Sequence, residues 1–183
     1  MIDYKTATKD ELLAEFKRLK ELSRDDGILT KKEFLHFPQI AMPNETPIAV
    51  SSGYMNGKTW LIILTNYRVI FLDKGMFFGL KQVALDLNHI SSIGGETKIL
   101  FGEISIAADG FTYTVEKVSK NGVLVFTNMV KEAMEALKQS TNTQHSPANN
   151  NDPFEQLERL ASLKEKGIIT EEEFQVQKAK ILG

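Results

Sequence analysis

The sequence predicts a mainly β protein with flanking helices, in which an antiparallel barrel or sandwich is closed by a C-terminal helix. A small helical hairpin is expected at each end of the chain. Short β-rich runs follow one another between about residues 45 and 126, and tight-turn dipeptides separate them, which favours antiparallel pairing. Apolar residues at helical spacing before and after this stretch predict the helices.

Residues 1–43 are expected to form the N-terminal helical hairpin. Its apolar stripe, which recurs at helical spacing, includes Leu12, Phe16 and Leu19. Gly27 is expected to end the first helix, because glycine tolerates a left-handed C-terminal position. Thr30 with Glu33 has the spacing of a capping box for a short second helix, which Pro38 is expected to end.

Residues 44–139 are expected to form the β domain with its closing helix. The β-rich runs are residues 60–64, 67–72, 83–87, 99–107, 111–118 and 123–126. Turns are expected at Asn56-Gly57, Asp73-Lys74-Gly75, Gly94-Gly95, Asp109-Gly110 and Asn121-Gly122. Residues 128–138 return to helical spacing, and this helix is expected to plug an open end of the barrel.

Residues 140–152 are polar, with almost no apolar side chains to repay the entropy of ordering, so a flexible tether is expected there. Residues 153–183 then return to helical spacing and predict the C-terminal hairpin. The apolar stripe of its first helix is Leu157, Leu160 and Leu163. Thr170 with Glu173 predicts a capping box that opens the second helix.

The two hairpins are near-copies of each other. Leu19 and Leu22, followed by Gly27 and Phe34, match Leu160 and Leu163, followed by Gly167 and Phe174, in the same order and nearly the same register. Helices of about ten residues are marginal alone, so each stripe must dock on something. Docking on the β domain of the same chain is one alternative, and docking on a second copy or another protein is the one we favour.

This preference gives a set of hypothetical partner or self-association contacts, in which the chain forms a homo-oligomer or binds another protein. The set consists of Leu12, Phe16, Leu19, Phe34, Leu157, Leu160, Leu163, Ile168 and Phe174.

The C-terminal thirty residues resemble the bacterial short C-terminal domain, SHOCT. The resemblance rests on the leucine triplet, on Gly167-Ile168-Ile169-Thr170 and on Glu173-Phe174. The middle of the chain resembles the bacterial PH-like (YokE-like) family through residues 64–71 and 85–93. These resemblances imply a PH-like barrel closed by a C-terminal helix, no enzymatic activity and hairpins that mediate oligomerisation or protein contacts. The N-terminal copy resembles a divergent SHOCT hairpin.

Composition excludes several classes of function. The chain has 22 basic and 24 acidic residues and no basic segment, which disfavours nucleic-acid binding. It has no cysteine, which excludes thiolate chemistry and fits a cytoplasmic setting, and we expect no signal peptide. His36, His89 and His145 lie far apart, and no catalytic, phosphate-binding or metal-ligand motif occurs. We therefore expect neither an enzyme nor a cofactor, and an enzyme with a dispersed site is the weakest alternative.

The loop at residues 75–80 suggests the main alternative function, that of a peripheral membrane protein. Met76, Phe77 and Phe78 lie between two strand runs, where polar turn residues are usual. If exposed, they would form an adhesive patch for a membrane surface or a protein, and otherwise they would cap the core. Specific phosphoinositide binding is disfavoured, because the first strand-turn edge offers Lys58 alone, although Lys74 and Lys81 could approach it and would assist the loop at a lipid surface.

Arg68 lies just after a tight turn in the sequence Thr-Asn-Tyr-Arg. It could contact a ligand, but we favour a structural role. In that interpretation the backbone of Asn66 adopts a positive φ in the turn, and Arg68 pairs with a carboxylate such as Asp86.

Overall fold

A computed structural model describes residues 2–27, 30–75, 79–143, 157, 160–162, 164 and 170–182. The chain divides into two compact units, Met1–Thr141 and Asn142–Gly183. The first unit contains the sheet and most of the helices, and the second contains the C-terminal hairpin.

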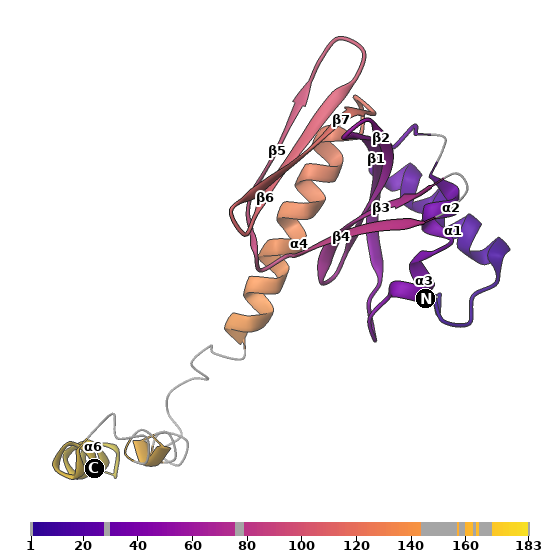
Figure 1. The fold of residues 1–183 in the computed structure, drawn as a ribbon. Coiled ribbons are helices and arrows are strands. Elements are labelled where there is room, and N and C mark those ends of the chain that lie inside the picture. Colours follow the sequence, from indigo (N-terminus) through magenta and orange to yellow (C-terminus); the bar gives the residue numbers. More distant parts are fainter. Residues whose placement is uncertain are drawn as a thin grey trace. The chain divides into compact units, whose positions relative to one another are not determined.

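The first unit is built on one antiparallel sheet of seven strands in the order β4-β3-β2-β1-β7-β6-β5 (Figure 1). The strands are β1 (Pro47–Met55), β2 (Lys58–Thr65), β3 (Arg68–Lys74), β4 (Leu80–Asp86), β5 (Ile90–Thr97), β6 (Gly102–Ala108) and β7 (Phe111–Val118). The two halves of the sheet meet at β1 and β7, which pair only at Tyr54 opposite Glu116. Strands β4 and β5 form the two edges, so hydrogen bonding does not close the sheet.

Helix α4 (Val123–Thr143) runs along the inside of the bent sheet (Figure 1). Its buried residues Val123, Phe126 and Val130 join the inward side chains of both halves of the sheet in one core. The predicted mainly β fold with a closing helix is therefore confirmed. The strand expected at 123–126 is wrong, because Val123 and Phe126 are three residues apart and face the core from the first turn of this helix.

Two of the predicted turns have the backbone that their sequences favour. Asn56 and Gly57 have φ of 53° and 74°, and Asp109 and Gly110 have φ of 52° and 81°. Positive φ at both central residues matches the twist of a two-residue hairpin. The turn expected at Gly94-Gly95 is wrong, because both glycines pair with β6 inside β5.

The N-terminal region forms α1 (Lys9–Ser23), α2 (Lys31–Phe34) and α3 (Phe37–Ile40). Three local predictions are corrected. Thr30 makes no capping bond, and the Glu33 carboxylate accepts from the backbone N–H of Lys74 in β3 instead of from Thr30 N. Pro38 lies in the first turn of α3, where its missing N–H costs nothing, instead of ending a helix. The left-handed residue after α1 is Arg24, with φ of 52°, and not Gly27.

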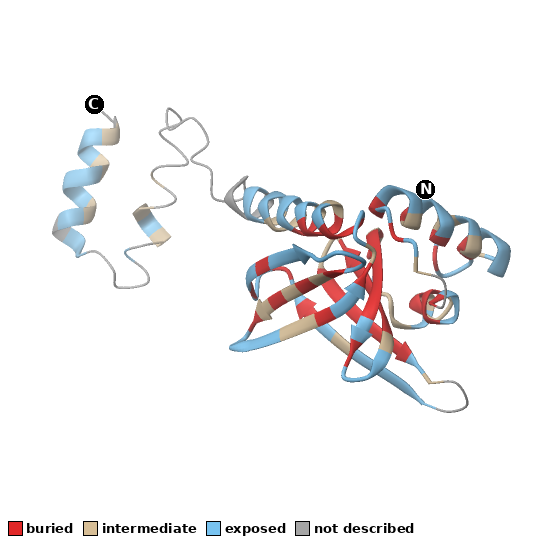
Figure 2. Cartoon of the chain, turned by 90° about the horizontal axis from the view of Figure 1, so that it is seen from above, coloured by how far each residue is buried: buried red, intermediate tan, exposed pale blue. Residues whose placement is uncertain are grey.

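These helices cover the outer face of strands β1 to β3. The second core cluster joins helix residues to strand residues: Tyr4, Leu12, Phe16, Leu19, Phe34 and Phe37 contact Val50, Leu61, Ile63, Ile70 and Leu72. Figure 2 shows buried positions along these strands and on α1. Strand β2 is buried on both faces, which explains why its sequence is a continuous apolar run rather than an alternating one.

The second unit contains α6 (Glu171–Leu182). The capping box predicted before this helix is present: Thr170 N donates to Glu173 Oε2 at 2.9 Å, and Glu173 N donates to Thr170 Oγ1 at 3.2 Å.

Helix α4 continues to Thr143, four residues into the segment expected to be a tether, and residues 144–152 lie outside the described part of the chain. In the described part, no helix is long and apolar enough to cross a bilayer.

Candidate interaction surfaces

The N-terminal hairpin is docked in cis. Leu12, Phe16, Leu19 and Phe34 are all buried against the sheet of their own chain. Phe16 stacks on Phe34 with ring centroids 5.0 Å apart. The structure thus does not support our hypothesis that these four side chains contact a partner, because packing inside the first unit already removes them from solvent.

Polar side chains at the C-terminal end of α1 and just after it hold this hairpin to β1. Ser23 Oγ accepts from Val50 N at 3.0 Å, and Asp25 Oδ1 accepts from Ser52 N at 3.3 Å and from Ser52 Oγ at 3.0 Å. These N–H groups lie on the side of β1 where β7 has diverged, so the two side chains replace a neighbouring strand. Burial raises the pKa of the Asp25 carboxyl, although its hydrogen bonds to Ser52 oppose the shift.

Gly27 lies directly against this contact. A methyl group at Gly27 would lie 1.6 Å from Ser52 Oγ, so only glycine allows the loop to approach β1 this closely. Gly27 is therefore required for close packing, and not for the left-handed helix end that we predicted.

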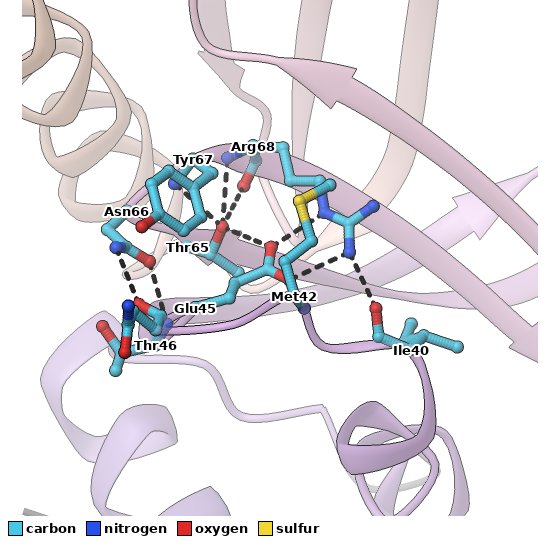
Figure 3. Close-up of polar contacts among 9 residues, drawn as sticks. Ile40, Met42, Glu45, Thr46, Thr65, Asn66, Tyr67 and Arg68 are labelled. Carbon is cyan, nitrogen blue, oxygen red and sulfur yellow. Dashed lines mark hydrogen bonds and ion pairs between the residues drawn. The ribbon is translucent and has the colours of Figure 1, made fainter.

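Arg68 forms a buried ion pair with Glu45 (Figure 3). Its Nε and Nη2 donate to the two carboxylate oxygens at 2.8 and 2.9 Å, and Nη2 also donates to the Ile40 carbonyl at 2.9 Å. Burial opposes the charge of Glu45, but hydrogen bonds from Arg68 and Thr65 outweigh it and lower the pKa of Glu45. The guanidinium thus joins the N-terminal region to the sheet, and it makes these hydrogen bonds within its own chain.

The structural interpretation of Arg68 was right in kind and wrong in detail. Its carboxylate partner is Glu45, whereas Asp86 is only its backbone neighbour across β3 and β4. Asn66 does not adopt a positive φ. Its side chain instead accepts from Thr46 N at 2.8 Å and donates to the Asn44 carbonyl at 3.1 Å.

The predicted loop patch of Met76, Phe77 and Phe78 lies outside the described residues. Of the lysines considered for phosphate binding, Lys58 forms an ion pair with Asp73, with Nζ 3.5 Å from Oδ2. No group of three acidic or histidine side chains in the described part of the chain could hold a metal ion.

A groove of about 460 Å³ lies between the loop that follows α1, strand β1 and strand β7. Its walls combine two aromatic rings with small residues and one lysine: Asp26, Gly27, Ser52, Gly53, Tyr54, Thr59, Phe101, Lys117 and Ser119. One end is fixed by Ser119 Oγ, which donates to Asp26 Oδ2 at 2.9 Å and to the Arg24 carbonyl at 3.0 Å. The volume is in the range of pockets that hold small ligands or single side chains.

The turn between β5 and β6 forms an exposed apolar tip beside this groove. Ile99, Leu100 and Phe101 are 90%, 77% and 51% exposed. This tip was not predicted from the sequence, because residues 99–107 were expected to be a strand, whereas β6 begins only at Gly102. Three consecutive apolar residues without alternation, next to a glycine, were the available signal.

Lys117 is placed over the groove by a β-bulge. The register between β6 and β7 shifts between Gly102 and Ile104, and Lys117 has φ of 54°. Its Nζ lies 4.6 Å from the centroid of the Tyr54 ring, which is the distance of a cation–π contact. Bulges of this kind redirect a side chain at the expense of regular pairing.

The described side chains of the C-terminal hairpin are exposed or half-buried. Leu157, Leu160 and Phe174 are half-buried, and no side chain that the structure describes between residues 157 and 181 is buried. The Lys164 ammonium lies 5.0 Å from the centroid of the Phe174 ring and pairs with Glu171. Leu163 and Ile168 lie outside the described residues, so their predicted contact role stays a prediction.

Comparison with known families assigns both parts of the chain. Residues 42–132 match the family described as bacterial PH domain, and residues 155–182 match the short C-terminal domain. The chain carries a bacterial PH domain followed by a SHOCT domain. No curated protein sequence is significantly similar to the chain.

Solved structures resemble the PH domain at low sequence identity. A DUF1696 family protein with a pleckstrin-homology domain from Shewanella loihica is 15% identical, covering 59% of this chain and 99% of its own, with a TM-score of 0.42. A pleckstrin homology domain from Shewanella amazonensis is 19% identical, covering 56% and 86%, with a TM-score of 0.39. A structure of human RhoA in complex with the DH/PH fragment of PDZRhoGEF is 15% identical. The match covers 70% of this chain and 39% of the other, with a TM-score of 0.34.

Proposed function

We propose that this protein is a non-enzymatic binding and assembly module, in which the SHOCT hairpin joins the PH domains of separate chains. The hairpin associates with the hairpin of a second copy and so makes the protein a homo-oligomer. The single observation that carries this proposal is the difference in burial between the two sequence-related hairpins.

In the N-terminal copy, Leu19 and Phe34 are completely buried, because the copy rests on the sheet. The equivalent residues of the C-terminal copy, Leu160 and Phe174, are only half-buried. An apolar stripe of this length gains stability mainly from the surface on which it packs, and helices this short are marginal without one. A second hairpin offers a stripe of the same length and chemistry.

The charges of the hairpin favour a partner of the same kind. Along α6 acidic residues gather at the N-terminal end, with Glu171 and Glu173, and basic residues near the C-terminal end, with Lys178 and Lys180. Two antiparallel copies would bring opposite charges together at both ends of the contact, as a closed two-fold interface requires.

Light scattering of the full chain and of a chain ending at Asp152 tests the proposal. The full chain is expected to have a mass that is a multiple of 20.6 kDa, and the shortened chain is expected to have the mass of one copy. Circular dichroism of the shortened chain must retain the β signal, which controls for unfolding of the PH domain. An equal number of copies for both chains would refute the assembly role.

A further inference from the structure

The groove between Tyr54 and Phe101 provides a second place to bind, separate from the SHOCT hairpin. Two aromatic rings that are 40% and 51% exposed, on a strand and on a tip from the other half of the sheet, line the same groove. Aromatic walls with exposed faces are the usual setting of binding hot spots, because a partner's side chain buries both of them at once.

Lys117 adds a charge to these walls. A non-glycine residue in the left-handed region costs about 1 kcal/mol, and such strain persists mainly where the surrounding structure or a function requires it. The strain here places the ammonium over the Tyr54 ring, and in the described part of the chain it has no carboxylate partner. A carboxylate from outside the chain would supply the missing partner.

The neighbouring surface carries charges of both signs. A second hollow, which shares Asp26 with the groove, is lined by Lys17, Lys20 and Arg24 among other residues. Of its three carboxylates, Asp25 is buried against Ser52, Asp26 accepts from Ser119 and Glu21 pairs with Lys17. Among described residues, Arg24 has no ion pair, whereas Asp26 keeps its charge because Ser119 is a neutral donor. The preference of the groove for a carboxylate therefore depends on Lys117.

The apolar tip itself is flanked by acidic side chains. Lys98 pairs with Glu103 at 2.9 Å, and Glu96 and Glu116 also lie near enough to raise the pKa of the Lys98 ammonium. These carboxylates would repel an anionic bilayer, so the tip is better suited to a polypeptide than to a lipid surface.

We propose that this groove binds a polypeptide segment of another protein in which an apolar side chain adjoins a carboxylate. The apolar side chain packs between Phe101 and Tyr54, and the carboxylate pairs with Lys117. The site and its occupant do not depend on self-association through the SHOCT hairpin.

A nuclear magnetic resonance titration of the full chain tests this with two matched probes. N-acetylphenylalanine carries the ring and a carboxylate, and N-acetylphenylalaninamide carries the same ring without the charge. Both are expected to shift the amide signals of residues 26–27, 52–54 and 117–119. The acid should bind about threefold more tightly, the gain of one partly exposed ion pair.

Three variants separate the contributions. Phe101→Ser should abolish binding of both probes, and Lys117→Gln should remove the preference for the acid while the amide still binds. Phe111, which is 68% exposed at the turn between β6 and β7, provides the matched control, and Phe111→Ser should leave both affinities unchanged.

Dispersed amide spectra of each variant establish that it is folded. The proposal is overturned if neither probe shifts the groove signals at 20 mM (roughly the weakest binding expected of so small a ligand). It is equally overturned if acid and amide bind alike, or if Phe111→Ser weakens binding as much as Phe101→Ser.

Discussion

Glu45 and Arg68 form a buried ion pair in the PH domain. The carboxylate receives hydrogen bonds from Arg68, Thr65 and the backbone of Met42, so neither charge is left without a partner in a dry environment. The benefit of such a pair is small compared with the cost of breaking it, because the remaining charge would stay buried and uncompensated.

Glu45→Gln should therefore lower the free energy of unfolding by about 3 kcal/mol. Glu21→Gln, which removes the exposed pair with Lys17, is the matched control and should change it by less than about 0.5 kcal/mol. Urea denaturation at pH 7 measures both. Similar small losses for the two variants would show that the buried pair does not hold the N-terminal region to the sheet.

Asp25 gives the PH domain a specific dependence on pH. Because burial raises the pKa of its carboxyl above the ordinary value of 3.8, the folded state holds this proton more tightly than the unfolded state does. The contribution of Asp25 to stability is thus largest below that ordinary value and declines as pH rises through the raised pKa. Its hydrogen bonds to Ser52 limit the decline without reversing it.

In Asp25→Asn the amide oxygen still accepts from Ser52, but no charge develops. The stability of this variant relative to the natural protein should therefore rise between pH 4 and pH 7. Thermal unfolding at several pH values measures the difference directly. A difference that stays flat or falls with pH would mean that the folded state does not disfavour the ionised carboxylate.

The secondary-structure elements differ in how far their sequences determine them. The strand runs at 60–64, 67–72 and 111–118 and the first helix follow directly from apolar pattern and turn residues. Residues 123–126 read as a strand because three of them are β-branched or aromatic, yet contacts with the core made them the start of α4. A capping box formed at Thr170 but not at Thr30, where the Glu33 carboxylate accepts from a backbone N–H of β3.

The groove was beyond sequence reasoning for a related reason. Tyr54, Phe101 and Lys117 come from three elements, and they meet only because β7 crosses β1 at one residue pair and bulges there. Neither the crossing nor the bulge leaves a recognisable motif in the sequence. The repeat, in contrast, was visible from the sequence. The docking of its N-terminal copy on the sheet of the same chain could not be predicted from the sequence.

The two hairpins should respond very differently to the same truncation. Phe34→Ala removes a ring that is fully buried between α1, α3 and the sheet, and should destabilise the PH domain by about 3 to 5 kcal/mol. Phe174→Ala should leave the unfolding of that domain within about 0.5 kcal/mol of the natural protein, because Phe174 belongs to the other unit.

Urea unfolding followed by the fluorescence of Trp60 reports on the PH domain alone, because Trp60 is the single tryptophan and is buried in β2. Equal losses in the two alanine variants would mean that the C-terminal hairpin contributes to the stability of the PH domain.

At the scale of the whole molecule, one chain contains two units that differ in how far their apolar side chains are buried. The first unit, the PH domain together with the N-terminal hairpin, buries apolar side chains on both faces of the sheet. In the SHOCT hairpin, Leu157, Leu160 and Phe174 are only half-buried. Such a division suits a protein in which one unit recognises a ligand and the other sets the number of copies.

Sedimentation equilibrium of the full chain with single substitutions on α6 tests the assembly role most directly. Phe174 is half-buried and Val176, two residues on, is 55% exposed, so the two positions separate the stripe from the opposite face of the same helix. We predict that Phe174→Asp reduces the mass to 20.6 kDa, while Val176→Asp keeps the multiple found for the natural protein. A natural protein that sediments as a single copy at every concentration, or equal behaviour of the two variants, would show that the hairpin does not assemble the chain.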